Sequence, residues 1–283
     1  MSAPRTVVDK RFTNTLALGA IWLCALTTVA CLGSLLIYIV INGIRELTPA
    51  FIFTWPHGVN MEGGIWPTIQ STIYVTLLAM VIVTPVAVLA AVYLAEYAVQ
   101  GRLVRTIRFA ADSLASVPSI VMGLFGLALF VEGLGLQFST LAGALALSFL
   151  MLPIIMRTTE EAIRAVPKYI RWGSYGLGAS KWQTVSRIVL PAASPRILTG
   201  LLLAMGRAAG ETAVVIYTMG TMIAAPISPL DPGRTMPVHV MLMAMEGINL
   251  KAAYGTALLL VIMVLAFNLT ARYVVRRNRS MQG

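Results

Sequence analysis

The stretch from Ile197 to Tyr217 reads I-L-T-G-L-L-L-A-M-G-R-A-A-G-E-T-A-V-V-I-Y and places Arg207 and Glu211 inside an apolar run. No other charged residue occurs between Ile197 and Leu230. Arg207 lies about ten residues into this run, or about 15 Å along a helix, near the middle of a roughly 30 Å hydrocarbon core. A charge at that depth is costly, so an ionisable residue there is a candidate for function. The stretch therefore predicts a membrane-spanning helix with a functional charge.

Arg207 and Glu211 are four residues apart, a spacing that puts both on one face of a helix. Two interpretations follow. In one, the two charges neutralise each other and only hold helices together. In the other, Arg207 is a cation that lines a path for an anionic solute, and Glu211 moderates its attraction. The sequence leaves both open.

The composition is that of a membrane protein. Hydrophobic residues make up 58% of the chain and charged residues 11%, whereas soluble domains carry about 25% charge. A spanning helix needs about 20 apolar residues. We therefore predict an all-α polytopic membrane protein with one membrane domain over residues 16–275, between a segment 1–15 and a tail 276–283. Its predicted spans are residues 16–42, 67–95, 108–131, 138–157, 196–223 and 253–273.

Basic residues predict the orientation in the membrane. With this arrangement of spans, 17 of the 21 lysines and arginines fall on the side of the N-terminus, and only Arg45, Arg234 and Lys251 fall opposite. Because positive residues favour the inner side, both termini are expected in the cytoplasm. The basic residues flank helices and form no single groove, so nucleic-acid binding is not indicated.

The first span is too long for a cleaved signal peptide and is predicted to be an uncleaved helix. It contains both cysteines, Cys24 and Cys31. Seven residues of helix separate them by about 10 Å, too far for a disulfide. The sequence contains no CxxC pattern and no cluster of histidine and cysteine, so no metal site is predicted.

Three segments outside the spans are large enough to matter. Segments 43–66 and 224–252 are expected on the outer side, the first as an irregular loop and the second with a short interfacial helix at 236–249. The segment 157–196 is expected inside. We predict there a short helix, a turn at Gly178, and a second short helix that ends before Pro191. Apolar residues in this charged segment indicate a docking element.

The spacing of Gly178, Lys181-Trp182 and Ile188-x-Leu190-Pro191 resembles the cytoplasmic coupling motif of ABC importer permeases. The family motif opens with Glu-Ala-Ala, where this chain has Trp172-Gly173-Ser174. The departure leaves the usual contacts of the motif's glutamate unaccounted for, while the downstream glycine and Leu-Pro remain.

Four further motifs resemble, in order and spacing, the A-type permease of the bacterial high-affinity phosphate ABC importer. They are L-A-E-Y at 94–97, S-V-P-S-I-V-M-G at 116–123, R-T-T-E at 157–160 and R-A-A-G-E-T-A at 207–213. The resemblance covers residues 63–275. It implies a type I ABC importer permease fold with six transmembrane helices and a coupling helix within 160–191.

The resemblance also implies a location in the inner membrane of a bacterial cell, and it implies partners. They are a second phosphate permease that completes a heterodimer, two ATPase subunits that use ATP-Mg, a periplasmic phosphate-binding protein, and membrane lipid. The chain contains no G-x-x-x-x-G-K-[ST] loop, so ATP hydrolysis is expected in another subunit. The chain itself is expected to be a non-catalytic permease without a cofactor.

The predicted site residues fall into two groups. Guanidinium suits a tetrahedral oxyanion because it offers a planar fork of donors. The substrate path is expected to include Arg207, Glu211, Thr212, Ser116, Ser119 and Arg157. Coupling to the ATPase is expected to involve Tyr175, Leu177, Gly178, Lys181, Trp182, Leu190 and Pro191.

Purely structural roles are also open for several of these residues. The serine hydroxyls, Ser113 among them, also suit back-bonding to their own helix. Arg157 also suits a helix anchor, and Asp112 suits an ion pair with Arg108. For the whole chain, the alternatives are a permease for molybdate or sulfate, an anion channel or antiporter, and a membrane scaffold. A channel needs only the intramembrane charges, and a scaffold needs only the docking element.

Overall fold

The computed structural model describes residues 10–58 and 61–280. Residues 1–9 of the predicted segment 1–15 and residues 281–283 of the tail lie outside the described part. The helices, with η for π-helical turns, are α1 (Lys10–Gly43), α2 (Pro49–Phe53), α3 (Trp66–Val92), η1 (Tyr93–Tyr97), α4 (Arg102–Ser116), α5 (Ser119–Gly126), η2 (Leu127–Gly133), α6 (Thr140–Arg164), α7 (Lys168–Gly176), α8 (Lys181–Thr184), η3 (Val185–Val189), α9 (Leu190–Ala209), α10 (Ala213–Thr218), α11 (Met236–Met245) and α12 (Leu250–Ser280). Strands β1 (Pro56–His57) and β2 (Glu62–Gly63) form a small antiparallel hairpin within the segment predicted to be irregular.

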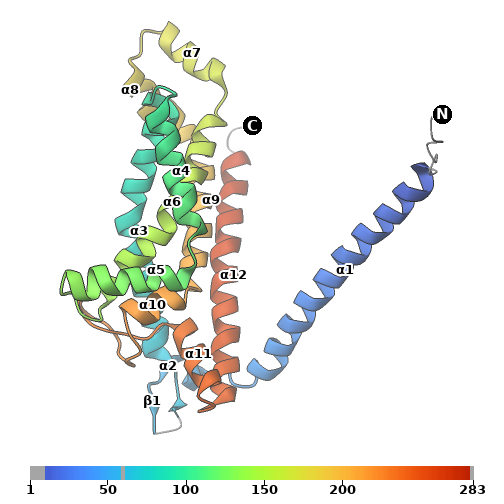
Figure 1. The fold of residues 1–283 in the computed structure, drawn as a ribbon, viewed down its shortest axis with the longest axis vertical. Coiled ribbons are helices and arrows are strands. Elements are labelled where there is room, and N and C mark those ends of the chain that lie inside the picture. The colour runs from blue at the N-terminus through green and yellow to red at the C-terminus, as the bar shows by residue number, and fades with distance from the viewer. Residues whose placement is uncertain (1–9, 59–60, 281–283) are drawn as a thin grey trace, which may run out of the picture.

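Five described helices are long and apolar enough to cross a membrane, and a sixth crossing is possible through one bent pair. The five are Asn14–Gly43, Trp66–Tyr97, Thr140–Arg164, Lys181–Ala209 and Leu250–Thr270. The chain is thus a multi-pass membrane protein. Lys10 and Ser280, the described ends of α1 and α12, point toward the same end of the molecule as α7 (Figure 1).

The third predicted span, 108–131, is wrong as a continuous helix. The structure divides it into α4 and a second part formed by α5 and η2, which meet at an angle of 101°. Pro118 causes the break, because it lacks an amide hydrogen and forces Val117 into an extended conformation, with φ −67° and ψ 130°. Figure 1 shows α5 lying across the bundle while α4 runs along it.

The fifth predicted span, 196–223, has different ends in the structure. A continuous helix begins at Lys181, so the predicted end of a short helix before Pro191 is also wrong. Pro191 lies in the first turn of α9, directly after the π-turn η3. Proline has no amide hydrogen to donate, but at this position the helix continues without that bond. The helix ends at Ala209, and α10 begins only at Ala213.

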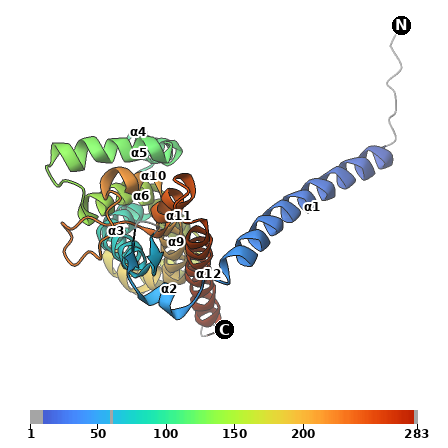
Figure 2. The same ribbon diagram turned by 90° about the horizontal axis from the view of Figure 1, so that it is seen from below.

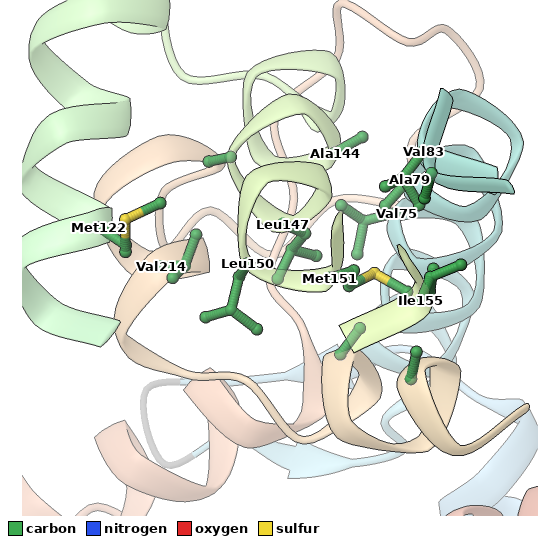
Figure 3. Close-up of a cluster of buried hydrophobic side chains, with 14 of the residues drawn as sticks. Val75, Ala79, Val83, Met122, Ala144, Leu147, Leu150, Met151, Ile155 and Val214 are labelled. Carbon is green, nitrogen blue, oxygen red and sulfur yellow. The ribbon is translucent and has the colours of Figure 1, made fainter. Parts of the chain in front are cut away.

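The core lies where α3, α6, α5 and α10 meet (Figure 3). Small residues of α3, such as Ala79 and Ala87, allow α6 to approach closely, and Leu147 and Met151 of α6 are fully buried. Gly200 does the same for α9, since a Cβ there would lie 2.4 Å from the hydroxyl of Thr158 on α6. Small residues at crossings are typical of helices that pack within a membrane.

Helix α1 stands away from this bundle (Figures 1 and 2). It meets α12 near its own end, where the rings of Tyr38 and Tyr254 lie 5.7 Å apart in an edge-on arrangement. Gly43 allows this approach, because a Cβ there would lie 2.6 Å from the carbonyl oxygen of Tyr254. Most other described side chains of α1 are exposed. An apolar helix with such a surface suits contact with lipid.

The segment before α11 is fixed to the first turns of α3 by polar contacts. Gln70 and Ser71 donate hydrogen bonds to the carbonyls of Pro226 (3.3 Å) and Ala224 (3.0 Å). The hydroxyl of Thr72 accepts one from the Met236 amide at 2.8 Å. Helix α11 forms where a short helix is predicted, but its buried side packs within the protein and against α12. The prediction of an interfacial helix is therefore corrected to a partly buried one.

Candidate functional site

Arg207 lies in the last turn of α9, next to the interruption at residues 210–212. Its side chain is exposed. It lines a cavity of about 160 Å³ whose other walls are apolar. The walls come from the end of α4, from α5 and from α6, and consist of Leu114, Ala115, Val117, Met122, Leu150 and Ile154. The break between α4 and α5 thus supplies part of the wall opposite the guanidinium.

Glu211 does not share a helix face with Arg207, because the helix ends at Ala209. The described residues include no ion pair between the two side chains. The amide of Gly210 donates to the Arg207 carbonyl at 3.2 Å, a bond to the third residue back that tightens the last turn of the helix. The interpretation as a mutually neutralising pair is therefore wrong for this conformation, and Arg207 faces the cavity without that carboxylate.

The predicted hydroxyl residues flank the two helix breaks. Ser116 ends α4, and its hydroxyl donates to the Ser113 carbonyl at 2.7 Å. This bond agrees with the structural interpretation, in which the serine hydroxyls bond to their own helix. Ser119 begins α5 and is half-buried. Thr212 caps α10 and is also half-buried. The cavity wall beside Arg207 contains none of these three residues.

Arg157, on α6, forms ion pairs with Asp112 of α4 and, at 3.7 Å, with Glu161. The predicted pair between Asp112 and Arg108 is therefore wrong. Arg108 instead binds Glu160 at 2.8 Å. The reason is tertiary, because α4 lies against α6 and offers its charges to that helix. Arg157 is exposed enough to serve both as an anchor and as a cation open to solvent.

Three neighbouring cavities share lining residues between Arg207 and this charged region. The cavity of Arg207 shares Ala115 and Ile154 with a cavity of about 240 Å³ that contains Arg157. That cavity shares Asp112 and Arg157 with another of about 210 Å³. The last is lined by Arg108, Ala111, Asp112, Pro153, Met156, Arg157, Glu160, Glu161 and Arg164. A row of guanidinium groups along α4 and α6 thus follows Arg207.

Chemically, this row changes character along its length. Around Arg207 the other lining side chains are apolar, so the guanidinium is the one described lining side chain there that can form charge-assisted hydrogen bonds to an anion. Around Arg157 and Arg108, carboxylates balance the arginines, so any anion competes with Asp112 or Glu160. The surroundings of Arg207 therefore suit an oxyanion better than those of Arg157 and Arg108, where carboxylates already pair with the arginines.

The predicted coupling segment forms a helix, a turn and a second helix that continues into α9. Gly178 has φ +81°, a conformation that favours glycine. Helix α8 begins with a capping box between Ser180 and Gln183. Beside this turn, Leu177 is 92% exposed, and the rings of Tyr175 and Trp182 are exposed as well. Leu190 and Pro191 lie farther along, where the segment joins α9.

The residues in place of Glu-Ala-Ala have a structural role of their own. Ser174 is buried, and its hydroxyl bonds the Thr184 hydroxyl at 2.8 Å, which joins α7 to α8. Trp172 is exposed near Tyr169 in the sequence of α7. We call the exposed residues Tyr169, Trp172, Tyr175, Leu177 and Trp182 the aromatic surface. Exposed apolar groups of this extent mark an interaction site.

Sequence reasoning missed one buried ion pair. Glu96 of η1 accepts hydrogen bonds from Arg171 of α7 at 2.7 Å and 3.1 Å. The signal was present, because Glu96 is the first carboxylate after a long apolar run and a carboxylate in that position needs a partner. The partner, 75 positions away in the sequence, is set by the fold alone.

A second missed feature lies at the other end of the molecule. Arg234 is buried and donates from Nε to the Thr221 carbonyl at 2.6 Å, while its Nη1 has no partner. His239, on α11, is 1% exposed and neither ring nitrogen has a partner. Burial, together with the charge of Arg234, lowers the pKa of His239 to about 4.

Comparison with known proteins identifies the family of the chain. The family described as binding-protein-dependent transport system inner membrane component matches residues 84–280. The chain is 37% identical to the probable ABC transporter permease protein YqgI of Bacillus subtilis, over 94% of this chain and 96% of that protein. It is 38% identical to the phosphate transport system permease protein PstA 1 of Mycobacterium tuberculosis H37Rv, over 80% of this chain and 77% of that protein.

Solved structures show the same fold at lower identity. An inward-facing structure of the MetNI methionine ABC transporter matches 76% of this chain and 94% of its own, with a TM-score of 0.60 and 22% identity. A bacterial alginate ABC transporter in complex with an alginate pentasaccharide-bound periplasmic protein matches 95% of this chain and 97% of its own. The TM-score is 0.68 and the identity is 13%. These likenesses show a type I ABC importer permease fold.

Proposed function

Because the chain belongs to the family of binding-protein-dependent transport system inner membrane components, we propose that it is the permease subunit of an ATP-driven inorganic phosphate importer. It forms half of the translocation path and hydrolyses no ATP itself. The relatives named as phosphate transport permeases support the choice of phosphate. The observation that carries the proposal is the guanidinium of Arg207, open to an apolar cavity at the end of a membrane helix.

Phosphate must leave water to cross the membrane, and Arg207 offsets part of that cost by charge and by paired hydrogen bonds. Among the described residues no carboxylate lines the cavity beside Arg207, so no side chain there competes with the anion for the guanidinium. The anion then passes Arg157, where Asp112 and Glu161 compete for the same guanidinium. This competition weakens phosphate binding beside Arg157, so phosphate is released and does not remain bound.

Helix ends on both sides of the path suit a gate. Residues 210–212 interrupt the helix beside Arg207, and Pro118 separates α4 from α5 in the opposite wall. Small rotations at such breaks open or close a passage without disrupting whole helices. Thr212 and Ser119 flank these breaks and offer neutral hydroxyls, while Glu211 offers a carboxylate that approaches Arg207 in another conformation.

The aromatic surface is the site for the ATPase subunit. It is exposed, apolar and rich in tryptophan and tyrosine, which are the residues that dominate protein interfaces. Gly178 and the capping box fix its shape. Binding of ATP-Mg by two partner ATPases moves this segment, and hydrolysis returns it, which gives alternating access.

The remaining partners follow from the two ends of the molecule, which lie on opposite sides of the membrane. With α7 and both termini in the cytoplasm, the hairpin and the loop at 224–235 face the periplasm and meet a phosphate-binding protein. A second permease supplies the other half of the path, opposite the row of cavities. The spans lie in the inner membrane, and the exposed sides of α1 contact lipid.

Purification of the tagged chain in mild detergent, followed by reconstitution of the complex in vesicles, tests the proposal. An ATPase and a second permease should co-purify. The vesicles should take up phosphate, but not sulfate or molybdate, when ATP and the binding protein are present. Uptake of sulfate or molybdate in place of phosphate would reassign the substrate. Uptake without any ATPase would make the chain a channel or antiporter.

A further inference from the structure

Residues 93–97, L-A-E-Y preceded by Tyr93, form a π-helical turn at the end of α3. Its closing bond joins the Ala98 amide to the Tyr93 carbonyl at 2.8 Å. A π-turn inserts one extra residue and changes the face that the following side chains occupy. Here the change brings Glu96 and Tyr97 against the coupling segment formed by α7 and α8.

Two contacts join this turn to that segment. Nε and Nη2 of Arg171 on α7 both donate to Oε1 of Glu96, in an ion pair whose side chains are 14% and 8% exposed. The ammonium of Lys181, at the start of α8, lies 4.9 Å from the centre of the Tyr97 ring. Buried apolar residues from the ends of α3 and α6 and from η3 pack together beside these contacts, including Val92, Ile163, Val166, Val185 and Val189.

Arg171 also donates to the carbonyls of Val166 at 2.6 Å and Ile163 at 2.8 Å, near the end of α6. One guanidinium therefore holds the ends of α3 and α6 to α7. Helix α6 is tied to α7 in any case, because only three residues separate them. Helix α3 is distant in sequence and depends on noncovalent contacts. Glu96 is its one described charged link to α7.

The opposite end of α3 is fixed as well. Gln70, Ser71 and Thr72 bind the loop at 224–236, the segment that the proposed function assigns to the periplasmic side. Helix α3 thus has polar attachments at both ends, one on each side of the proposed membrane. A helix resists compression along its axis, so displacement at one end reaches the other.

We propose that Glu96 and Arg171 are positioning residues that make α3 follow the coupling segment, so that α3 carries motion between the ATPase side and the loop that meets the binding protein. The inference rests on the proposed function and adds the route of transmission.

The test measures phosphate imported per ATP hydrolysed by the complete complex in vesicles. Glu96→Gln keeps the volume but removes the charge, and should lower this ratio about fivefold, the size expected when a residue modulates coupling. ATPase activity and co-purification of the ATPase should stay near the parent values. Arg171→Gln should behave alike, and the double variant should be no worse than either single one. Glu132→Gln, an exposed carboxylate on η2, is the control and should match the parent.

A rescue separates transmission from a general loss of structure. The pair Y97C and K181C, bridged by a short bifunctional thiol reagent in a background free of Cys24 and Cys31, replaces the lost attachment with a covalent one. Bridging should restore the ratio in the Glu96→Gln variant. The proposal fails if that variant keeps the parent ratio, if losses add in the double variant, if bridging restores nothing, or if the variant does not assemble. A parent complex that neither binds an ATPase nor imports phosphate would instead refute the proposed function.

Discussion

At the scale of single residues, the role of Arg207 depends on where its helix stops. A spacing of four residues pairs it with Glu211 only if the helix continues, and the helix ends at Ala209. The guanidinium therefore faces a cavity whose other lining residues are apolar. An arginine in such surroundings is available for a solute anion.

Replacing Arg207 tests this directly. Arg207→Gln should abolish phosphate uptake, whereas Arg207→Lys should retain a fraction, because lysine keeps the charge but loses the planar fork. Uptake by reconstituted vesicles measures both. Arg102→Gln, which removes an exposed charge from α4, should transport normally. If Arg207→Gln assembles and imports phosphate at the parent rate, Arg207 has only a structural role.

The separation of Arg207 from Glu211 gives a second expectation. If no ion pair joins them, their effects on stability should add within about 0.5 kcal/mol in a double-mutant cycle of Arg207→Gln and Glu211→Gln. Thermal unfolding of the purified complex gives the stability of the parent, of each single variant and of the double variant. A buried ion pair would behave otherwise, because losing one partner costs about 3–5 kcal/mol. A large interaction energy would show that the two residues pair in solution.

His239 predicts a dependence of stability on pH. Its folded pKa of about 4 lies below the ordinary value of 6.5, because burial and Arg234 disfavour the charged form. Between these pH values the unfolded chain binds a proton that the folded chain does not. Stability should therefore fall as the pH drops from about 6.5 to about 4, by roughly 3 kcal/mol in total, and then level off. Above pH 6.5 this residue should contribute no slope.

Melting temperatures measured from pH 8 to pH 4 check this expectation. His239→Gln should flatten the curve in that range. His57→Gln removes the other histidine, which is exposed on the hairpin, and should leave the curve as it is in the parent. Equal slopes for His239→Gln and the parent would mean that another group is responsible.

At the scale of elements, the coupling segment depends on one turn. Gly178 reverses the chain with φ +81°, and the aromatic surface lies on both sides of it. Gly176, two residues earlier, ends α7 without a positive φ, and a Cβ there would meet nothing within 4 Å. The two glycines therefore differ in backbone conformation and are alike in having open space.

Gly178→Val should disturb this turn, because a left-handed conformation costs a residue with a side chain about 1–2 kcal/mol. We expect ATP hydrolysis to continue while phosphate uptake per ATP falls, with normal insertion in the membrane. Gly176→Val adds the same side chain at an unstrained position and should remain close to the parent. Coupled uptake by Gly178→Val equal to that of the parent would remove the argument that the turn shapes the docking surface.

At the scale of the whole molecule, two ends of different chemistry are held apart by the helices. One end carries the aromatic surface, and the other carries the hairpin and the loop before α11 (Figure 1). The loop is not uniformly accessible. Gly233 is buried against Met219 and Ser71, whereas Ile227 is 89% exposed. Ile227 is therefore a suitable position for a topology probe.

Thiol labelling tests the orientation in intact cells after Cys24 and Cys31 are replaced by serine. Ile227→Cys should react with an impermeant reagent added from outside. Leu177→Cys, on the aromatic surface, should react only after the membrane is opened. Gly233→Cys serves as a buried control and should react slowly in both conditions. Labelling of Leu177→Cys in intact cells would reverse the proposed topology.

The sequence by itself determined the class of the protein. Long apolar runs predict membrane helices because unpaired backbone groups cannot face lipid. Gly178 predicts the turn of the coupling segment through its own backbone preference, and the structure gives it φ +81°. Each of these inferences depends on residues that are close together in the chain.

Only the tertiary structure decided which distant groups meet. Asp112 pairs with Arg157 and not with neighbouring Arg108, and Glu96 pairs with Arg171 across 75 positions. It also decided that the helix before Arg207 begins at Lys181, since the π-turn η3 accommodates Pro191. Local patterns specify which residues need a partner or a break. The partner itself depends on how α3, α4, α6 and α7 pack, because burial makes an ion pair necessary only after the helices have come together.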